Sequence, residues 1–145
     1  MVETILVRPD LSTEMTSAGR TLLVALDQHG LEFEAAFWLM DENNGRWHLM
    51  LSSRSVKEHG TMAVYKRVDK VLSKLGLQDV LWIGMVSVIG DRTPIVQSLR
   101  GVLGAAASVD GTRLDNSFVE GVQIPGCLLY RLSRRQKIQP DPRGA

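Results

Sequence analysis

Apolar residues in the first part of the chain recur with the period of an α-helix. Between about residues 13 and 29 they gather on one side of the helix and leave the other side polar. Ser12 or Thr13 can cap the amino end, and Gly30 is a typical carboxyl-terminal stop. The pattern therefore predicts a first helix with one buried face, formed by Met15, Ala18, Leu22, Leu23, Ala25 and Leu26.

The pattern of residues 31–55 changes to that of a β-hairpin with turn residues at its centre. A two-residue Asn44-Gly45 turn would pair odd-numbered with even-numbered residues across the hairpin. A three- or five-residue loop with a glycine bulge pairs odd with odd instead. We expect this second register because it separates apolar from polar side chains better. It places on one face Phe33, Phe37, Leu39, Trp47, Leu49 and Leu51, and on the other Glu32, Glu34, Trp38, His48 and Ser52.

The rest of the chain alternates between helical and extended patterns. The predicted elements are a helix over about 61–75, a strand over 80–89, a helix over about 94–103, and strands near 117–124 and 127–132. The first of these strands is apolar on both alternations, as in a central strand covered on both faces. Gly76 can end the second helix, and Thr93 with Pro94 fits the start of the third.

The predicted order of elements is α-β-β-α-β-α-β-β. A long helical connection between strands favours a parallel, right-handed crossover, whereas each hairpin joins antiparallel strands. We therefore expect a single α/β domain, with α+β as the alternative, that contains a mixed sheet of about five strands with helices packed on it. The domain is expected to span residues 1–132. Residues 133–145 lack apolar periodicity and are expected to form a disordered basic tail.

The composition is that of a globular protein, with 44% hydrophobic and 23% charged residues among 145. The single cysteine, Cys127, excludes an internal disulfide and fits a reducing compartment. The first ten residues carry acids and a proline where a signal peptide needs an apolar core. No apolar run approaches the roughly 20 residues of a membrane-spanning helix. We therefore expect a soluble, cytoplasmic protein that does not associate with membranes.

The charges are distributed unevenly although the net charge is only +1. Residues 1–40 carry −4, residues 41–100 carry +3 and residues 101–145 carry +2. The outer face of the second predicted helix is basic. A basic face can follow a phosphate backbone, so nucleic-acid binding is one hypothesis; the alternative is an ordinary solvated helix face. The residues concerned lie on the outer face of the second predicted helix and are Lys66, Arg67, Lys70 and Lys74.

A second hypothesis concerns the loops that follow two predicted parallel strands. Parallel strands end at the same edge of a sheet, so the loops at 52–55 and 90–93 are expected to meet where α/β proteins bind ligands. The start of the third helix would add N–H donors. A phosphate-bearing ligand, either bound or turned over by a small enzyme, fits this chemistry, whereas capping and turn roles are the alternative. The predicted anion-binding residues are Ser53, Arg54, Ser55, Arg92 and Thr93.

Motifs for catalysis, metal binding or cofactor binding are not recognisable in the sequence. His29, His48 and His59 lie in different predicted elements, without His-x-x-x-His or Cys-x-x-Cys spacing. In the expected register His48 shares a face with Glu32 and Glu34, which would suit a general base, and a structural histidine is the alternative. We predict no catalytic residue, no metal and no cofactor.

The leading functional hypothesis comes from the second face of the hairpin. Trp38, Met40 and Met50 are expected to lie there together, and aromatic and methionine side chains are enriched at the centres of protein interfaces. If it is exposed, this patch would bind a protein partner or a second copy of the chain; if helices cover it, it is a second layer of core. We therefore predict a non-enzymatic binding or accessory protein, with phosphate-ligand binding and nucleic-acid binding as the alternatives.

Overall fold

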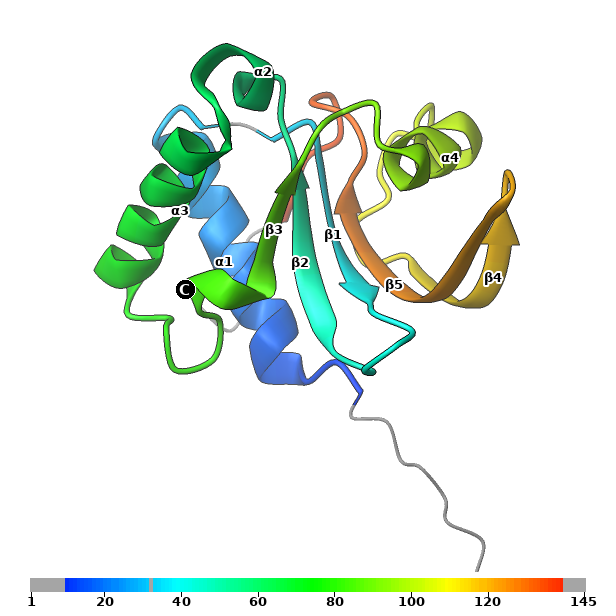
Figure 1. The fold of residues 1–145 in the computed structure, drawn as a ribbon, viewed down its shortest axis with the longest axis horizontal. Helices are drawn as coiled ribbons and strands as arrows, with labels where there is room; N and C mark the ends of the chain where they lie inside the picture. Colours follow the sequence, from blue (N-terminus) through cyan, green and yellow to red (C-terminus); the bar gives the residue numbers. More distant parts are fainter. Residues whose placement is uncertain (1–9, 32, 140–145) are drawn as a thin grey trace, which may run out of the picture.

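The computed structural model describes residues 10–31 and 33–139 and contains one mixed sheet. Its described strands have the order β3-β2-β1-β5-β4, in which the β2–β3 pair is parallel and the other pairs are antiparallel. The strands are β1 (Ala35–Met40), β2 (Trp47–Ser52), β3 (Val86–Ile89), β4 (Arg113–Val119) and β5 (Val122–Arg131). The helices are α1 (Thr13–Gln28), α2 (Ser55–His59), α3 (Thr61–Leu75) and α4 (Pro94–Leu103), with a 3-10 turn, η1 (Ile83–Met85). The expected single domain with helices packed on a mixed sheet is confirmed, and it belongs to the α+β class (Figure 1).

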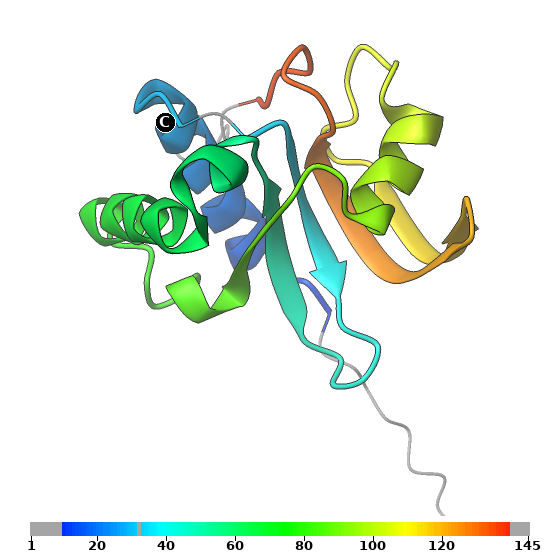
Figure 2. The ribbon, with the colours of Figure 1, turned by 45° about the horizontal axis from the view of Figure 1, so that its top comes forward.

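Helices cover both faces of the sheet, and each face has its own core. α1 and α3 pack side by side over one face, where Leu22, Leu49 and Leu72 are fully buried. On the other face, α4 packs against β4 and β5 and contributes Val96 and Leu99 to the core. The β4–β5 hairpin curls toward α4 on this side (Figures 1 and 2).

β1 is covered on both faces, and this determines the register of the first hairpin. Trp38 belongs to the core under α1 and Phe37 to the core under α4, and both side chains are fully buried. Phe37 pairs with Met50 and Trp38 pairs with Leu49, so odd-numbered residues face even-numbered ones. The expected odd-with-odd register is therefore wrong. Its argument required one polar face, whereas both faces of this hairpin are core.

The loop of this hairpin contains four residues, 42–45, instead of the expected three or five. The amide of Asp41 donates to the carbonyl of Arg46 at 2.8 Å, and the amide of Gly45 donates to the carbonyl of Asp41 at 2.8 Å. Gly45 has a φ of 69°, in the left-handed region that glycine adopts without a steric penalty. An even number of loop residues keeps odd positions opposite even ones.

β3 is an edge strand, which differs from the expected central strand. The apolar run at 80–89 is divided, because Ile83–Met85 forms η1 and only Val86–Ile89 is strand. The amide of Val88 donates to the hydroxyl of Tyr65 in α3 at 2.9 Å. The run is apolar on both alternations because part of it is not strand, and because α3 packs beside the strand that remains.

The segment after β5 packs against the domain. Sequence reasoning assigned residues 133–145 to a disordered tail, whereas Gln136 is buried. Its side-chain oxygen accepts a hydrogen bond from the Leu132 amide at 2.6 Å, and its nitrogen donates to the Ala106 carbonyl at 2.8 Å. Such polar anchors leave no apolar periodicity to detect. Residues 140–145 lie outside the described residues.

A buried hydrogen-bond chain holds α1 against the sheet. The Trp38 indole N–H donates to the Tyr130 hydroxyl at 3.0 Å, and that hydroxyl donates to the Thr16 carbonyl in α1. Gly19 permits this approach, because a Cβ there would lie 2.7 Å from the hydroxyl oxygen and 2.9 Å from the indole nitrogen. Burial raises the pKa of Tyr130, so its hydroxyl stays protonated and keeps its donor role.

We predict that Gly19→Ala destabilises the fold, because the added methyl group forces Tyr130 or Trp38 to move. The free energy of unfolding should fall by about 1–3 kcal/mol, the usual cost of overpacking a core. Gly101→Ala is the matched control, since Gly101 also lies in a helix and nothing would touch its Cβ within 4 Å. The control should gain about 0.5–1 kcal/mol from helix propensity. Urea denaturation measures both, and equal effects would contradict the role given to Gly19.

Candidate functional site

Three strands end at the same edge of the sheet, and the loops after them lie together. β2 and β3 are parallel, and β5 runs in the same direction as β2 because both are antiparallel to β1. The segments that follow these strands lie along the upper edge of Figure 1 and come forward in Figure 2. The loops at 52–55 and 90–93 therefore leave neighbouring strands at one edge, and residues 132–139 join them there.

The residues predicted to hold an anion lie at this edge, but several of their donors are already engaged. The Arg54 amide donates to the Glu34 carboxylate at 3.2 Å. The Thr93 hydroxyl donates at 2.7 Å to the backbone carbonyl three residues before it. Ser53 is buried, and Ser55 begins α2. These loops therefore provide a ligand with positive charge but with few free N–H and O–H donors.

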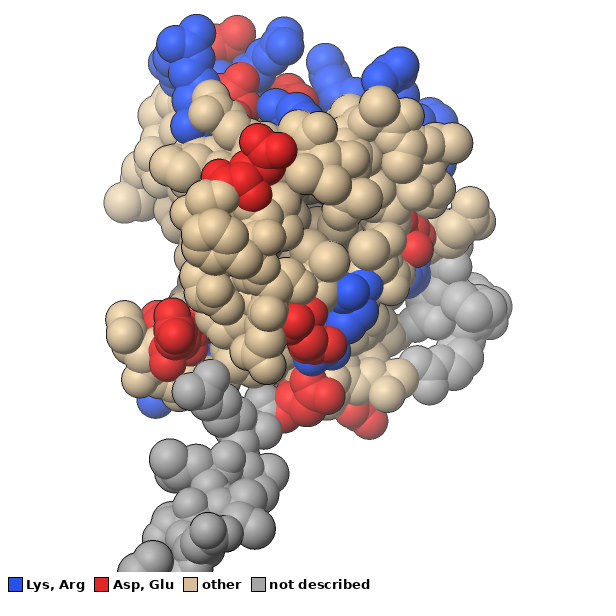
Figure 3. All heavy atoms as spheres, turned by 90° about the vertical axis from the view of Figure 1, so that its right-hand side faces the viewer, with Lys and Arg blue, Asp and Glu red and all other residues tan. Residues whose placement is uncertain are grey.

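Exposed basic side chains extend over all three loops. Arg54 and Arg92 are both exposed, and α2 adds Lys57 beside them. The segment after β5, which sequence reasoning had not placed here, contributes Arg134, Arg135 and Lys137. Figure 3 shows Lys and Arg side chains gathered at this end of the molecule.

The basic face of α3 continues from this edge. All four predicted nucleic-acid residues, Lys66, Arg67, Lys70 and Lys74, are exposed. A single glycine separates α2 from α3, so the amino end of α3 adjoins the basic loops. Between these helices lies a recess of about 270 Å³, lined in part by His59 and Arg67. The predicted anion corner and the predicted nucleic-acid face are thus neighbours.

We define the basic surface as Arg54, Lys57, Lys66, Arg67, Lys70, Lys74, Arg92, Arg134, Arg135 and Lys137. It holds 10 of the 17 Lys and Arg residues of the chain. Three acids, Glu58, Asp69 and Asp91, lie on the same segments, and a fourth, Glu34, accepts a hydrogen bond from the Arg54 amide; with these four acids the net formal charge here is +6 and that of the remaining chain is −5. Apart from Arg134, no member of the surface forms an ion pair with a described residue. A net charge of +1 therefore conceals a strong separation of charge.

The residues proposed as a hairpin interface do not form one exposed patch. Trp38 is fully buried under α1, where it bonds to Tyr130. Met50 lies on the opposite face of the sheet, paired with Phe37, while Met40 shares the face of Trp38. The expectation of a shared face followed from the wrong register. Trp38 is also not exposed, because α1 covers its side chain.

The histidines are not assembled with catalytic partners in the described part of the chain. His48 pairs with Leu39 and lines a recess of about 390 Å³ with Asp41 and Ser87. No hydrogen bond joins His48 to either of these residues, and its Nδ1 is buried without a partner among described residues. The expected pairing of His48 with Glu34 is absent, because His48 pairs with Leu39 near the other end of the hairpin and the Glu34 carboxylate accepts a hydrogen bond from the Arg54 amide. Glu32, the second expected partner, lies outside the described residues. Groups of three or more metal-ligating side chains do not occur among the described residues.

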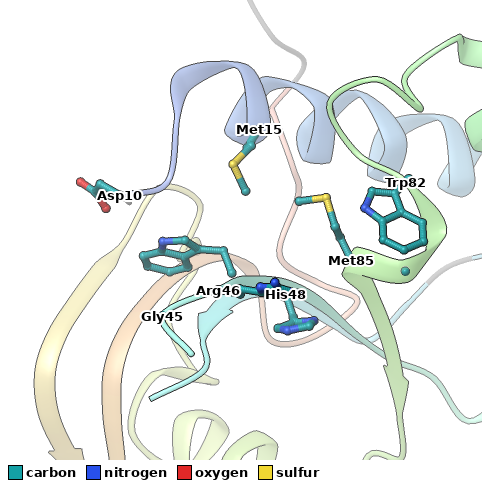
Figure 4. Close-up of a pocket in the computed structure, with 9 residues that line it drawn as sticks. Asp10, Met15, Gly45, Arg46, His48, Trp82 and Met85 are labelled. Atoms are coloured by element: carbon teal, nitrogen blue, oxygen red, sulfur yellow. The ribbon is translucent and has the colours of Figure 1, made fainter. Parts of the chain in front are cut away.

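Sequence reasoning missed a pocket at the opposite end of the sheet. It has a volume of about 350 Å³ and lies between α1, the start of β2 and the η1 turn, with Met15, Trp47, Trp82 and Met85 in its lining (Figure 4). The available signal was Trp82 followed two positions later by Gly84, because a glycine lets an aromatic ring lie on the backbone. Both residues belong to the apolar run at 80–89, which was predicted to be a strand, so this signal was overlooked.

Comparison of the chain with protein-family models, with characterised proteins and with solved structures finds no match. Within the described residues, every helix is too short or too polar to cross a membrane.

We predict that Cys127 reacts with a thiol reagent at pH 8 only after the protein unfolds. Burial in the core under α4 raises the pKa of the Cys127 thiol from 9.0 to about 12, so the nucleophilic thiolate is scarce in the folded state. The folded state therefore retains a proton that the unfolded state loses, and this contribution to stability, complete below pH 9, falls as the pH rises from about 9 to 12. Reaction rates with and without urea test this, with Cys127→Ser as the blank. Equal rates in both conditions would contradict it.

Proposed function

We propose that this protein binds the phosphate backbone of nucleic acid through the basic surface. The observation that supports the proposal is the separation of charge, with +6 on this surface and −5 on the remaining chain. Lysine and arginine side chains that neutralise phosphates release condensed counterions, and this release drives most sequence-independent binding. Nine of the ten basic residues have no ion pair with a described acid, so their charge is available to phosphates.

An extended polyanion fits this surface better than a small phosphate-bearing ligand does. α3 contains 15 residues, which gives it a length of about 22 Å. The basic loops lie beyond its amino end, so the surface is longer than any single phosphate group requires. A small ligand would need several convergent donors, and the Arg54 amide and the Thr93 hydroxyl are already bonded. Duplex DNA presents one charge per roughly 1.7 Å and can engage many positions at once.

The proposal keeps the predicted class of a non-enzymatic binding protein and changes its partner and its surface. A protein interface at Trp38, Met40 and Met50 is not proposed, because Trp38 is core. Contacts from exposed Lys and Arg side chains to phosphates carry no base information, so we expect little preference among sequences. Self-association and a cytoplasmic location stay predictions.

We predict salt-dependent binding of the full chain to a 5′-labelled random DNA duplex of about 30 base pairs, measured by fluorescence anisotropy between 50 and 200 mM salt. The slope of log affinity against log salt should become shallower by about 0.9 for each phosphate contact that a substitution removes. The test variants are Arg92→Glu and the four-fold replacement of Lys66, Arg67, Lys70 and Lys74 by Glu.

Arg46→Glu is the matched control for Arg92→Glu. Both residues are exposed and each substitution changes the net charge by the same amount, but Arg46 lies at the opposite end of the sheet. The control should keep the wild-type salt slope, whereas the test variants should not. Equal losses for Arg46→Glu and Arg92→Glu would mean that only net charge matters, and an unchanged slope in the four-fold variant would reject the α3 face.

A further inference from the structure

The pocket missed by sequence reasoning lies at the sheet edge opposite the basic loops at 52–55 and 90–93. Its walls come from three separate parts of the chain: Met15 from α1, Trp47 from β2, and Trp82 with Met85 from the turn that precedes β3. In Figure 4 the side chains of Met15 and Met85 point into the space between α1 and the strands, while that of His48 points away from them. A volume of about 350 Å³ is within the range of small-molecule sites.

Trp82 is held in place although it is largely exposed. Its relative exposure is 57%, which is unusual for a tryptophan that packs against its own backbone. The ring lies on Gly84, where a Cβ would come within 2.1 Å of the indole carbons. One face of the ring is thus occupied by the glycine. The ring is preorganised for a ligand, which lowers the entropy cost of binding.

Trp47 forms a second fixed aromatic wall. It is only 5% exposed, and the Arg113 guanidinium carbon lies 5.0 Å from the centroid of its ring. Arg113 is itself held by Asp10 at 2.9 Å and by Asp115 at 3.0 Å. A Cβ on Gly126 would come within 2.8 Å of the ring, so the indole packs closely on β5 as well. Trp47 cannot turn away from the pocket without breaking these contacts.

The polar groups of the pocket lining balance one another. Asp10 and Arg46 carry the two formal charges of the lining, and they are of opposite sign. The hydrogen bond from Arg113 lowers the pKa of Asp10, so that carboxylate stays ionised and committed to Arg113. The two methionines present polarisable thioethers, which adapt to rings of different shape. An uncharged ligand therefore suits this lining better than an anion or a cation.

We infer that this pocket, the Trp82 pocket, binds a small uncharged aromatic molecule that stacks on Trp82 and contacts Met15 and Met85. Offset stacking on a fixed indole ring supplies orientation as well as affinity. The inference is independent of nucleic-acid binding, because the pocket and the basic surface share no residue.

The three tryptophans of the chain allow a test that shows where in the protein a ligand binds. In the ¹⁵N-labelled full chain each indole N–H gives one NMR cross-peak, and N-phenyl-1-naphthylamine serves as the uncharged probe. Saturable binding should shift the cross-peaks of Trp47 and Trp82, whereas that of Trp38 should stay in place because its N–H is bonded to buried Tyr130. Shifts of Trp38 alone, or no saturable shift, would overturn the inference.

Two variants and a matched control complete the test. Trp82→Ala should weaken probe binding at least tenfold, and Gly84→Ala should weaken it as well, because the new methyl group displaces the Trp82 ring. Phe118→Ala removes an aromatic side chain that is 71% exposed elsewhere and should leave the affinity unchanged. Undiminished binding by Trp82→Ala would overturn the proposed site.

The anionic relative 1-anilinonaphthalene-8-sulfonate distinguishes the ligand class. It has the same aromatic skeleton with an added sulfonate, and we expect smaller shifts of Trp47 and Trp82 at equal concentration. If only the sulfonate shifts these two cross-peaks, the pocket recognises an anion and the uncharged class is wrong. If neither probe shifts these cross-peaks, the pocket does not bind a small aromatic molecule and the inference fails.

Discussion

The close approach of α1 to the sheet at Gly19 is the contact on which the rest of the structure depends. At that point the Tyr130 hydroxyl accepts a hydrogen bond from Trp38 in β1 and donates one to Thr16 in α1, so a single buried oxygen joins a helix and the two central strands. Buried polar groups of this kind require partners, and the observed placement of α1 supplies the acceptor for the Tyr130 hydroxyl. A side chain on Gly19 would separate the helix from these partners. The cover over Trp38, and with it the two-sided burial of β1, follows from this contact.

Two-sided burial explains how much of the fold could be predicted from the sequence. α1, α3, α4 and most strands were predicted because their signals are local: periodic apolar residues, a cap before α1 and glycines after α1 and α3. The short helix α2 was not predicted, because its five residues are too few to show a period. The hairpin register failed because the polarity rule compares a buried face with a solvated one, and β1 has no solvated face. The anchoring of Gln136 was missed for a related reason, since its side-chain nitrogen donates to the carbonyl of Ala106, 30 positions away in the chain.

Only the part of the candidate site that depends on the direction of strands close together in the chain could be predicted from the sequence. A helical connection from β2 to β3 predicted a parallel pair, and this placed Arg54 and Arg92 at one edge. Arg135 reaches the same edge because β5 pairs antiparallel with β1, nearly a hundred residues away in the chain. Such a long-range pairing leaves no trace in composition or periodicity. The net charge of +1 also gave no sign of the basic surface, because the sum conceals charges that the fold separates.

Strand direction also explains why the two ends of the sheet differ in chemistry. The ends of β2, β3 and β5 carry polar loops, and their basic side chains point into solvent. The start of β2 and the turn before β3 instead meet α1, and apolar side chains from all three enclose the Trp82 pocket. β2 has six residues, so the two regions are about 20 Å apart along the strand. α3 joins them, because its amino end adjoins the basic loops and it packs against η1. A change at Gly19 therefore disturbs both the core under α1 and the pocket, because Met15 of α1 lines the pocket.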